Sequence, residues 1–223
     1  MNPRKEGTVI LFQGDSITDG QRNKDPQQDW DLNHQIGHSY VYLLHAELGS
    51  RYPEKKLSFI NKGVSGNRIV DAYARLESDV IHRQPDIVSF MLGINDCHFQ
   101  LHDGSGATPA KFDKLYRMMI DELTEQLPAV RIALLEPFLL PVGRVAESLN
   151  EWTELLVPMQ AAVKRIAGEY GLLFVPLQQR FDELSQVREP SYWIWDGIHP
   201  TVNGHGIIAQ EWRQAAAQWI EEL

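Results

Sequence analysis

The stretch Val9-Ile10-Leu11-Phe12-Gln13-Gly14-Asp15-Ser16-Ile17-Thr18 decides the fold, because it joins an apolar run to a glycine turn that carries a serine. A short apolar run that ends at a glycine predicts a buried β-strand followed by a sharp turn. In an open α/β sheet the ligand crevice lies outside the carboxyl ends of the strands. Ser16 is therefore expected at that edge, either as a helix cap or as a nucleophile.

The rest of the chain repeats this pattern of apolar runs separated by amphipathic segments. Strands are predicted over Thr8–Gln13, Leu57–Asn61, Asp86–Leu92, Val130–Glu136 and Leu172–Pro176, and helices over Ser39–Tyr52, Arg68–Arg83, Pro109–Leu127, Trp152–Tyr170 and about Gly204–Leu223. The strand runs are continuously apolar, as in strands covered on both faces. Strands that alternate with helices predict βαβ units and a parallel sheet. No repeat or linker interrupts the pattern, so residues 1–223 are expected to form one domain.

Three connections are longer than such a fold requires, namely Asp19–His38, Cys97–Thr108 and Pro137–Asn150. We expect all three to be loops. The first two follow strands one and three, so they lie at the carboxyl edge of the sheet, where long loops usually carry specificity.

The composition limits the classes of partner. The net charge is −9, which argues against nucleic acid, since a nucleic-acid site needs a basic patch. No apolar stretch is long enough for a membrane-spanning helix, and no signal peptide is visible before the first strand, so a cytoplasmic location and no membrane contact are expected. The single cysteine, Cys97, excludes an internal disulfide.

A second candidate for chemistry is Asp196-Gly197-Ile198-His199-Pro200, near the end of the chain. A serine nucleophile needs a base to take its proton and an acid to orient that base. Asp196 and His199 are close enough in a Gly/Pro-bounded turn to point toward one spot. The structural alternative is that Asp196 caps the turn and His199 packs beside Pro200.

Two further candidates follow the second and third predicted strands. Gly66 lies in Lys62-Gly63-Val64-Ser65-Gly66-Asn67, and Asn95 lies in Gly93-Ile94-Asn95-Asp96. A backbone N–H at a glycine turn and an asparagine amide are usual donors to the oxyanion of a tetrahedral intermediate. Taken singly, Gly66 is equally explained by a tight turn and Asn95 by an Asx turn. Taken with Ser16, three strand ends deliver a nucleophile and two donors to one crevice.

These four blocks, in this order, resemble the SGNH (GDSL-type) hydrolases. The matching blocks are Gly14-Asp15-Ser16-Ile17-Thr18, Ser65-Gly66-Asn67, Gly93-Ile94-Asn95-Asp96 and Asp196-Gly197-Ile198-His199. The resemblance implies a flavodoxin-like, three-layer α/β/α sandwich with a five-stranded parallel sheet. It also implies a Ser16, His199 and Asp196 triad, an oxyanion hole made by the N–H groups of Ser16 and Gly66 and the amide of Asn95, and no cofactor.

A narrower resemblance links Asn61-Lys62-Gly63-Val64-Ser65-Gly66-Asn67 and Trp195-Asp196-x-x-His199-Pro200 to the bacterial acetylxylan esterases of this family. It implies a serine esterase that removes acetyl groups from oligosaccharides. One alternative is the same chemistry on a lipid or thioester, and another is a non-catalytic carbohydrate-binding protein. Related esterases often form homo-oligomers, to which the helix over 204–223 could contribute, although packing on the sheet explains that helix equally.

Tryptophans near these blocks are candidate substrate contacts. Trp193-Ile194-Trp195 is expected to place two indoles on one side of an extended segment directly before Asp196, and Trp30 lies in the polar connection after Ser16. Indoles can stack on sugar rings; the alternatives are core or interface packing. Catalysis by Cys97 and a histidine-bound metal are not expected, because neither has partners at suitable spacing.

Overall fold

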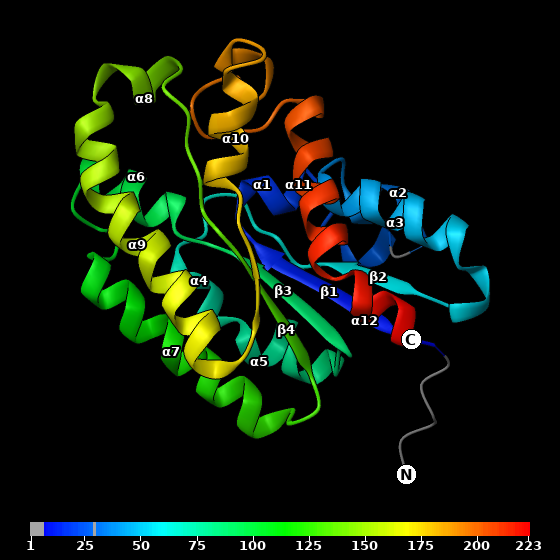
Figure 1. Cartoon of the computed structure of the whole chain (residues 1–223). Helices are drawn as coiled ribbons and strands as arrows, with labels where there is room; N and C mark the ends of the chain where they lie inside the picture. The colour runs from blue at the N-terminus through cyan, green and yellow to red at the C-terminus, as the bar shows by residue number, and fades with distance from the viewer. Residues whose placement is uncertain (1–6, 29) are drawn as a thin grey trace.

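A five-stranded sheet lies at the centre of the computed structural model, which describes residues 7–28 and 30–223 (Figure 1). The strands are β1 (Val9–Gly14), β2 (Ser58–Asn61), β3 (Ile87–Met91), β4 (Arg131–Leu135) and β5 (Leu173–Val175). Their order is β2-β1-β3-β4-β5, and every neighbouring pair is parallel. The predicted five-stranded parallel sheet is therefore confirmed, with β1 and β3 at its centre.

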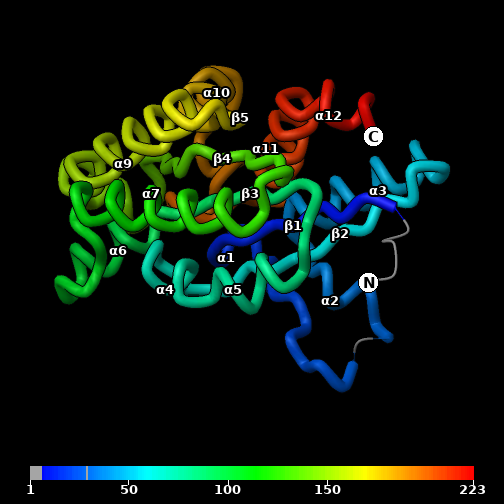
Figure 2. Tube along the Cα trace, turned by 90° about the horizontal axis from the view of Figure 1, so that it is seen from below, coloured from blue at the N-terminus to red at the C-terminus, as the bar shows by residue number. Residues whose placement is uncertain are grey.

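Helices cover both faces of the sheet, as the three-layer prediction requires (Figure 2). One layer contains α4 (Ile69–Ala74), α5 (Leu76–Asp79), α7 (Pro109–Gln126) and α9 (Leu149–Tyr170), and the other contains α3 (Tyr40–Arg51), α11 (Val202–Ala215) and α12 (Ala217–Glu222). The remaining helices are α1 (Ser16–Asp19), α2 (Leu32–Ile36), α6 (Ile94–His102), α8 (Gly143–Glu147) and α10 (Gln178–Ser185).

Several predicted connections and helices differ from the structure. The connection predicted over Cys97–Thr108 is helical as far as His102, because α6 begins directly after Gly93. Its apolar pattern is weak, since only Ile94 and Cys97 are buried apolar residues, and this explains why the helix was missed. The other two predicted loops contain α2 and α8, and α10 was not predicted. The helix predicted over 68–83 is divided at Arg75, and that over 204–223 at Ala216, where the backbone leaves helical geometry.

Aromatic side chains join the sheet to the layer that contains α3 and α11. The Phe12 ring packs against the rings of Tyr40, Phe59 and Trp212, at centroid distances of 5.8, 6.4 and 5.4 Å. The Trp212 indole also donates a hydrogen bond to the Ser89 hydroxyl on β3, at 2.8 Å. Burying one such side chain stabilises the fold by about 1.5–3 kcal/mol. α11 therefore packs on the sheet, which is the structural alternative for the C-terminal helix.

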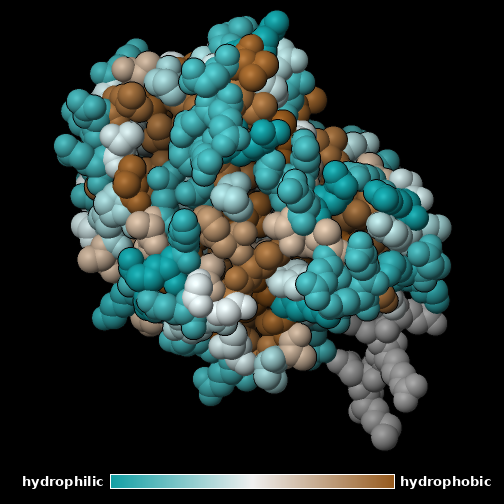
Figure 3. Space-filling model, viewed as in Figure 1, coloured by the Kyte–Doolittle hydropathy of each residue, from teal (hydrophilic) through white to brown (hydrophobic). Residues whose placement is uncertain are grey.

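Among the described residues, no helix combines the length and the hydropathy that a membrane crossing needs. Hydrophilic residues cover most of the face seen in Figure 3, and hydrophobic residues are visible in smaller areas between them.

The turn after β1 is tightly packed and places Ser16 at the start of α1. A Cβ atom on Gly14 would lie 2.3 Å from the Thr18 hydroxyl and 2.8 Å from the Met91 carbonyl, so only glycine fits there. The Asp15 carboxylate accepts a hydrogen bond from the Ile17 N–H at 2.9 Å and caps α1. Ser16 therefore follows the carboxyl end of the central strand, as the sequence predicts.

Asp15 is buried, and its second carboxylate oxygen has no hydrogen-bond partner among the described residues. Burial raises the pKa of Asp15 to about 7, against the lowering effects of the Ile17 N–H and of His199. Burial likewise raises the pKa of Asp96 to about 7. Between the ordinary carboxyl range and pH 7, the folded chain thus holds protons that the unfolded chain has released.

We expect Asp15 and Asp96 to lower the free energy of unfolding as pH rises from about 4 to about 7, because in that window both carboxyls stay protonated in the folded state and ionise in the unfolded state. His205, whose pKa burial lowers to about 4, acts in the opposite direction. Asp15→Asn removes one of the two carboxyl contributions. Between pH 4 and pH 7, the free energy of unfolding of Asp15→Asn should fall by roughly 1–3 kcal/mol less than that of wild type. Urea unfolding at pH 4, 5.5 and 7 measures this difference.

The matched control is Asp182→Asn, since Asp182 is exposed on α10. Its pH dependence should equal that of wild type. A pH dependence that Asp15→Asn leaves unchanged would show that Asp15 is ionised in the folded protein across this range.

Candidate active site

Three side chains from opposite ends of the chain form one hydrogen-bonded line at the carboxyl edge of the sheet. The Ser16 hydroxyl lies 2.9 Å from Nε2 of His199, and Nδ1 of His199 lies 2.8 Å from Oδ2 of Asp196. Ser16 begins α1, directly after the central strand, while Asp196 and His199 lie in the turn before α11. The structure therefore brings together the three residues that the sequence assigns to a triad.

The turn that carries Asp196 and His199 is stabilised by hydrogen bonds from its own backbone N–H groups to the Asp196 side chain. Oδ1 of Asp196 accepts hydrogen bonds from the N–H groups of Ile198 and His199, at 3.1 and 2.8 Å. Gly197 has a φ of +95°, and a Cβ there would lie 2.5 Å from the carbonyl oxygen of Val142. Asp196 thus caps the turn, as the structural alternative proposed, and also holds the His199 ring with its other oxygen.

The electrostatics of Asp196 decide the direction of the hydrogen bonds. Burial acts to raise the pKa of Asp196, but hydrogen bonds from the His199 ring and from the His199 and Ile198 N–H groups outweigh it and hold the pKa well below its usual range. An ionised carboxylate only accepts, so Nδ1 of His199 donates to it. Nε2 is then left as the acceptor for the Ser16 O–H, which is the arrangement that activates a hydroxyl for attack.

The expected oxyanion donors lie on segments that hydrogen bonds tie together. The N–H of Val64 donates to the carbonyl of Gly14 at 3.0 Å, and the Asn95 amide donates to the carbonyl of Asn67 at 3.2 Å. Gly66, between these two anchors, has a φ of +84°, and a Cβ there would contact nothing within 4 Å. The loop after β2 is therefore fixed beside the turn that carries Ser16 and beside the first turn of α6.

The candidate tryptophans lie in different surroundings. The Trp195 ring stacks on the His199 ring, with 5.5 Å between centroids and 19° between planes, and is 60% exposed. Trp193 does not share that side, because its backbone is helical rather than extended; its indole donates to the carbonyl of Leu184 at 3.2 Å. Trp30 is 75% exposed, and no ring contact joins it to a residue of the described chain.

Two residues near the triad were missed by sequence reasoning. Arg144, on α8, donates to Oδ2 of Asp196 at 2.7 Å. His98, on α6, stacks on His102 and Trp152, and its pKa is lowered by burial and then by the charge of Arg144. No local pattern points to either residue, because their roles depend on segments far away in the chain.

Across residues 7–28 and 30–223, no group of three or more His, Cys, Asp and Glu side chains is arranged to hold a metal ion. Cys97 is buried, and burial raises the pKa of its thiol, which keeps it protonated.

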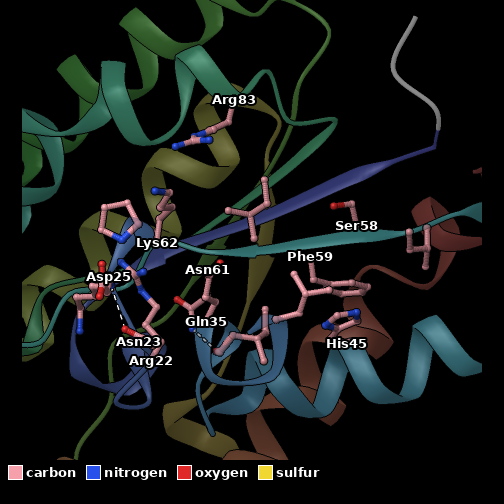
Figure 4. Close-up of a pocket in the computed structure, with 16 residues that line it drawn as sticks. Arg22, Asn23, Asp25, Gln35, His45, Ser58, Phe59, Asn61, Lys62 and Arg83 are labelled. Atoms are coloured by element: carbon pink, nitrogen blue, oxygen red, sulfur yellow. Dashed lines mark hydrogen bonds between the residues drawn. The ribbon is translucent and has the colours of Figure 1, made fainter. Parts of the chain in front are cut away.

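A groove of about 670 Å³ runs along the edge strand β2, away from the triad (Figure 4). Its lining includes Arg22, His45, Phe59, Lys62 and Arg83, and none of the triad residues. Part of the Asp19–His38 segment forms one wall of it, from Arg22 to Pro26 and again near Gln35. The Asp19–His38 segment therefore lines a hollow that none of the triad residues contacts.

Known proteins share this sequence and this fold. The model of the GDSL-like lipase/acylhydrolase family matches residues 12–207. An acetylxylan esterase of Geobacillus stearothermophilus is 34% identical over 230 residues, which cover 96% of each chain. Among solved structures, a protein described as a GDSL-like lipase from Parabacteroides merdae superposes with a TM-score of 0.88 at 30% identity, covering 96% of this chain and 97% of that chain. A catalytic mutant of the acetylxylan esterase Axe2 from Geobacillus stearothermophilus superposes with a TM-score of 0.83 at 33% identity, covering 94% of both chains.

The family match extends over most of the chain and includes every block on which the resemblance was based. The identity to the Geobacillus esterase extends over nearly the whole length of both proteins. The chain therefore belongs to the GDSL-like lipase/acylhydrolase family and is a carboxylic ester hydrolase.

Proposed function

We propose that this protein is a serine esterase that removes short acyl groups, chiefly acetyl, from oligosaccharides. The observation that carries the proposal is the line from the Ser16 hydroxyl through His199 to the ionised Asp196, at the edge of the sheet where α/β folds bind ligands. The same line accounts for each proton transfer that ester hydrolysis needs.

In the first half of the reaction, Ser16 attacks the ester carbonyl while Nε2 of His199 accepts its proton. Asp196 stabilises the imidazolium that forms. The tetrahedral oxyanion receives hydrogen bonds from the N–H groups of Ser16 and Gly66 and from the Asn95 amide. Removing one such donor typically raises a barrier by about 3 kcal/mol, so three donors supply a large part of the rate enhancement.

In the second half, His199 returns the proton to the departing sugar oxygen as the tetrahedral species collapses to an acyl-enzyme on Ser16. A water molecule then takes the place of the sugar hydroxyl. His199 removes a proton from that water while the water oxygen attacks the acyl carbon and forms the second tetrahedral species. When this species collapses, the bond from the acyl carbon to the Ser16 oxygen breaks, His199 returns the proton to Ser16, and acetate leaves. The groups that take part in these steps are the triad, the oxyanion donors, the ester and water.

The choice of carbohydrate as substrate rests on two supports. The Geobacillus relative, at 34% identity, is an acetylxylan esterase. The Trp195 indole is 60% exposed and lies parallel to the His199 ring, so its free face is available to a sugar beside the reacting ester. We propose Trp195 as a substrate contact and do not extend this proposal to Trp193 or Trp30.

Ser16→Ala should lower kcat for p-nitrophenyl acetate by at least about 10³-fold, because it removes the attacking oxygen. The matched control is Ser78→Ala on α5, whose exposed hydroxyl donates to the carbonyl of Arg75, and it should retain wild-type activity. Thermal unfolding of both variants verifies the fold. Activity that survives in Ser16→Ala would overturn the nucleophile, whereas sugar binding without turnover in wild type would favour a carbohydrate-binding protein.

The acyl preference separates acetyl esters from lipid or thioester substrates. We expect kcat/KM to fall from p-nitrophenyl acetate to the butyrate and further to the octanoate. Preference for the octanoate would leave the mechanism in place and move the substrate to a long-chain ester or thioester.

Trp195→Ala should raise KM for an acetylated xylo-oligosaccharide about fivefold, since an aromatic contact is worth about 1 kcal/mol. The effect on p-nitrophenyl acetate, which carries no sugar, should be smaller. Trp30→Ala is the matched control and should change neither value. Equal effects of Trp195→Ala on the two substrates would show that the indole acts on His199 rather than on the sugar.

A further inference from the structure

Arg144 contacts the same carboxylate oxygen that orients His199. Its Nη2 lies 2.7 Å from Oδ2 of Asp196, while Nδ1 of His199 lies 2.8 Å from that oxygen. The other oxygen, Oδ1, is already occupied by the N–H groups of Ile198 and His199. Four donors thus fix the Asp196 carboxylate, and Arg144 is the one that comes from outside its own turn.

The position of Arg144 is fixed by close backbone packing between the start of α8, with the residues just before it, and the Asp196 turn. The N–H of Leu140 donates to the carbonyl of Gly197 at 3.0 Å. A Cβ on Gly143 would lie 3.1 Å from the Asp196 carbonyl oxygen. The segment that carries Arg144 therefore has a defined position relative to Asp196.

The charge of Arg144 acts on His199 through this contact. An arginine remains protonated throughout the pH range of enzyme activity. Its positive charge offsets part of the carboxylate charge that would otherwise favour a proton on the His199 ring. The Arg144 side chain is 46% exposed, so solvent and salt weaken this effect without removing it.

Other titratable groups also face His199. Asp15 approaches from the turn after β1, His98 from α6 and His205 from α11. Burial lowers the pKa of His98 and lowers that of His205 to about 4, so His205 is neutral where an esterase works. Among the described residues, Arg144 is the one arginine or lysine that pairs with a member of the triad.

We infer that Arg144 is a positioning residue that acts through Asp196: it holds Oδ2 toward His199 and disfavours protonation of the His199 ring, so that the neutral base persists to lower pH. This inference rests on the proposed function, because it concerns the base of that reaction. It predicts a defined change in the pH profile rather than a simple loss of activity.

The test is the pH dependence of kcat/KM for p-nitrophenyl acetate in wild type, Arg144→Gln and Arg144→Lys, at low salt. In Arg144→Gln the acid limb should move to higher pH by roughly half to one unit. Arg144→Lys retains the charge and should restore most of the wild-type profile. About 1 M salt should reduce the difference between wild type and Arg144→Gln, since the arginine is partly exposed.

The matched control is Arg165→Gln, because Arg165 is 50% exposed and pairs with Asp113 on a different face of the molecule. It should leave the acid limb in place. An unshifted limb in Arg144→Gln, or a loss of activity that is uniform across pH, would overturn the inference. Failure of the proposed function is separate, since it appears as activity that survives Ser16→Ala in the same assay.

Discussion

The position of Ser16 depends on one close approach of backbone, at the end of the central strand. The Thr18 side chain and the Met91 carbonyl occupy the space that a Cβ on Gly14 would need, so no side chain fits there. The parallel register places Gly14 beside Met91, so β1 and β3 end at the same level, while Asn61 at the end of β2 lies beside Phe12. The turns that follow these three strands therefore deliver Ser16, Gly66 and Asn95 to the same edge.

Asp196 and His199 come from the other end of the chain and are held in place by a separate set of contacts. The turn of Asp196 and His199 is held by its own hydrogen bonds, and the backbone of the segment before α8 packs directly on it. α11 follows the turn, and its Trp212 is anchored in the core on Phe12 and Ser89. The same central strands thus position the serine directly and the histidine through α11.

Much of this arrangement could be predicted from the sequence, for physical reasons. Strands covered on both faces are continuously apolar, so the apolar runs in the sequence indicated how many strands there are and where each lies along the chain. Three short polar blocks follow strand ends, where a parallel sheet collects its functional residues, so Ser16, Gly66 and Asn95 could be named. Asp196 and His199 could be named from their spacing in a turn bounded by glycine and proline.

Other features depend on distant contacts that leave no local pattern. Oδ2 of Asp196 and the guanidinium of Arg144 meet across 52 residues of chain. The separation of Trp193 from Trp195 results from one helical residue in a segment expected to be extended. α6 buries too few apolar residues for its period to be recognised.

The measurement that tests the central claim most directly is covalent labelling with a sulfonyl fluoride, followed by peptide mass spectrometry. A serine activated by a neighbouring histidine is sulfonylated much faster than an ordinary hydroxyl. We expect one adduct per chain, on the peptide that contains Ser16, together with loss of ester hydrolysis in proportion to labelling. His199→Ala should slow the labelling strongly. Full inactivation with the adduct on another residue, or full labelling of Ser16 with activity retained, would contradict the account.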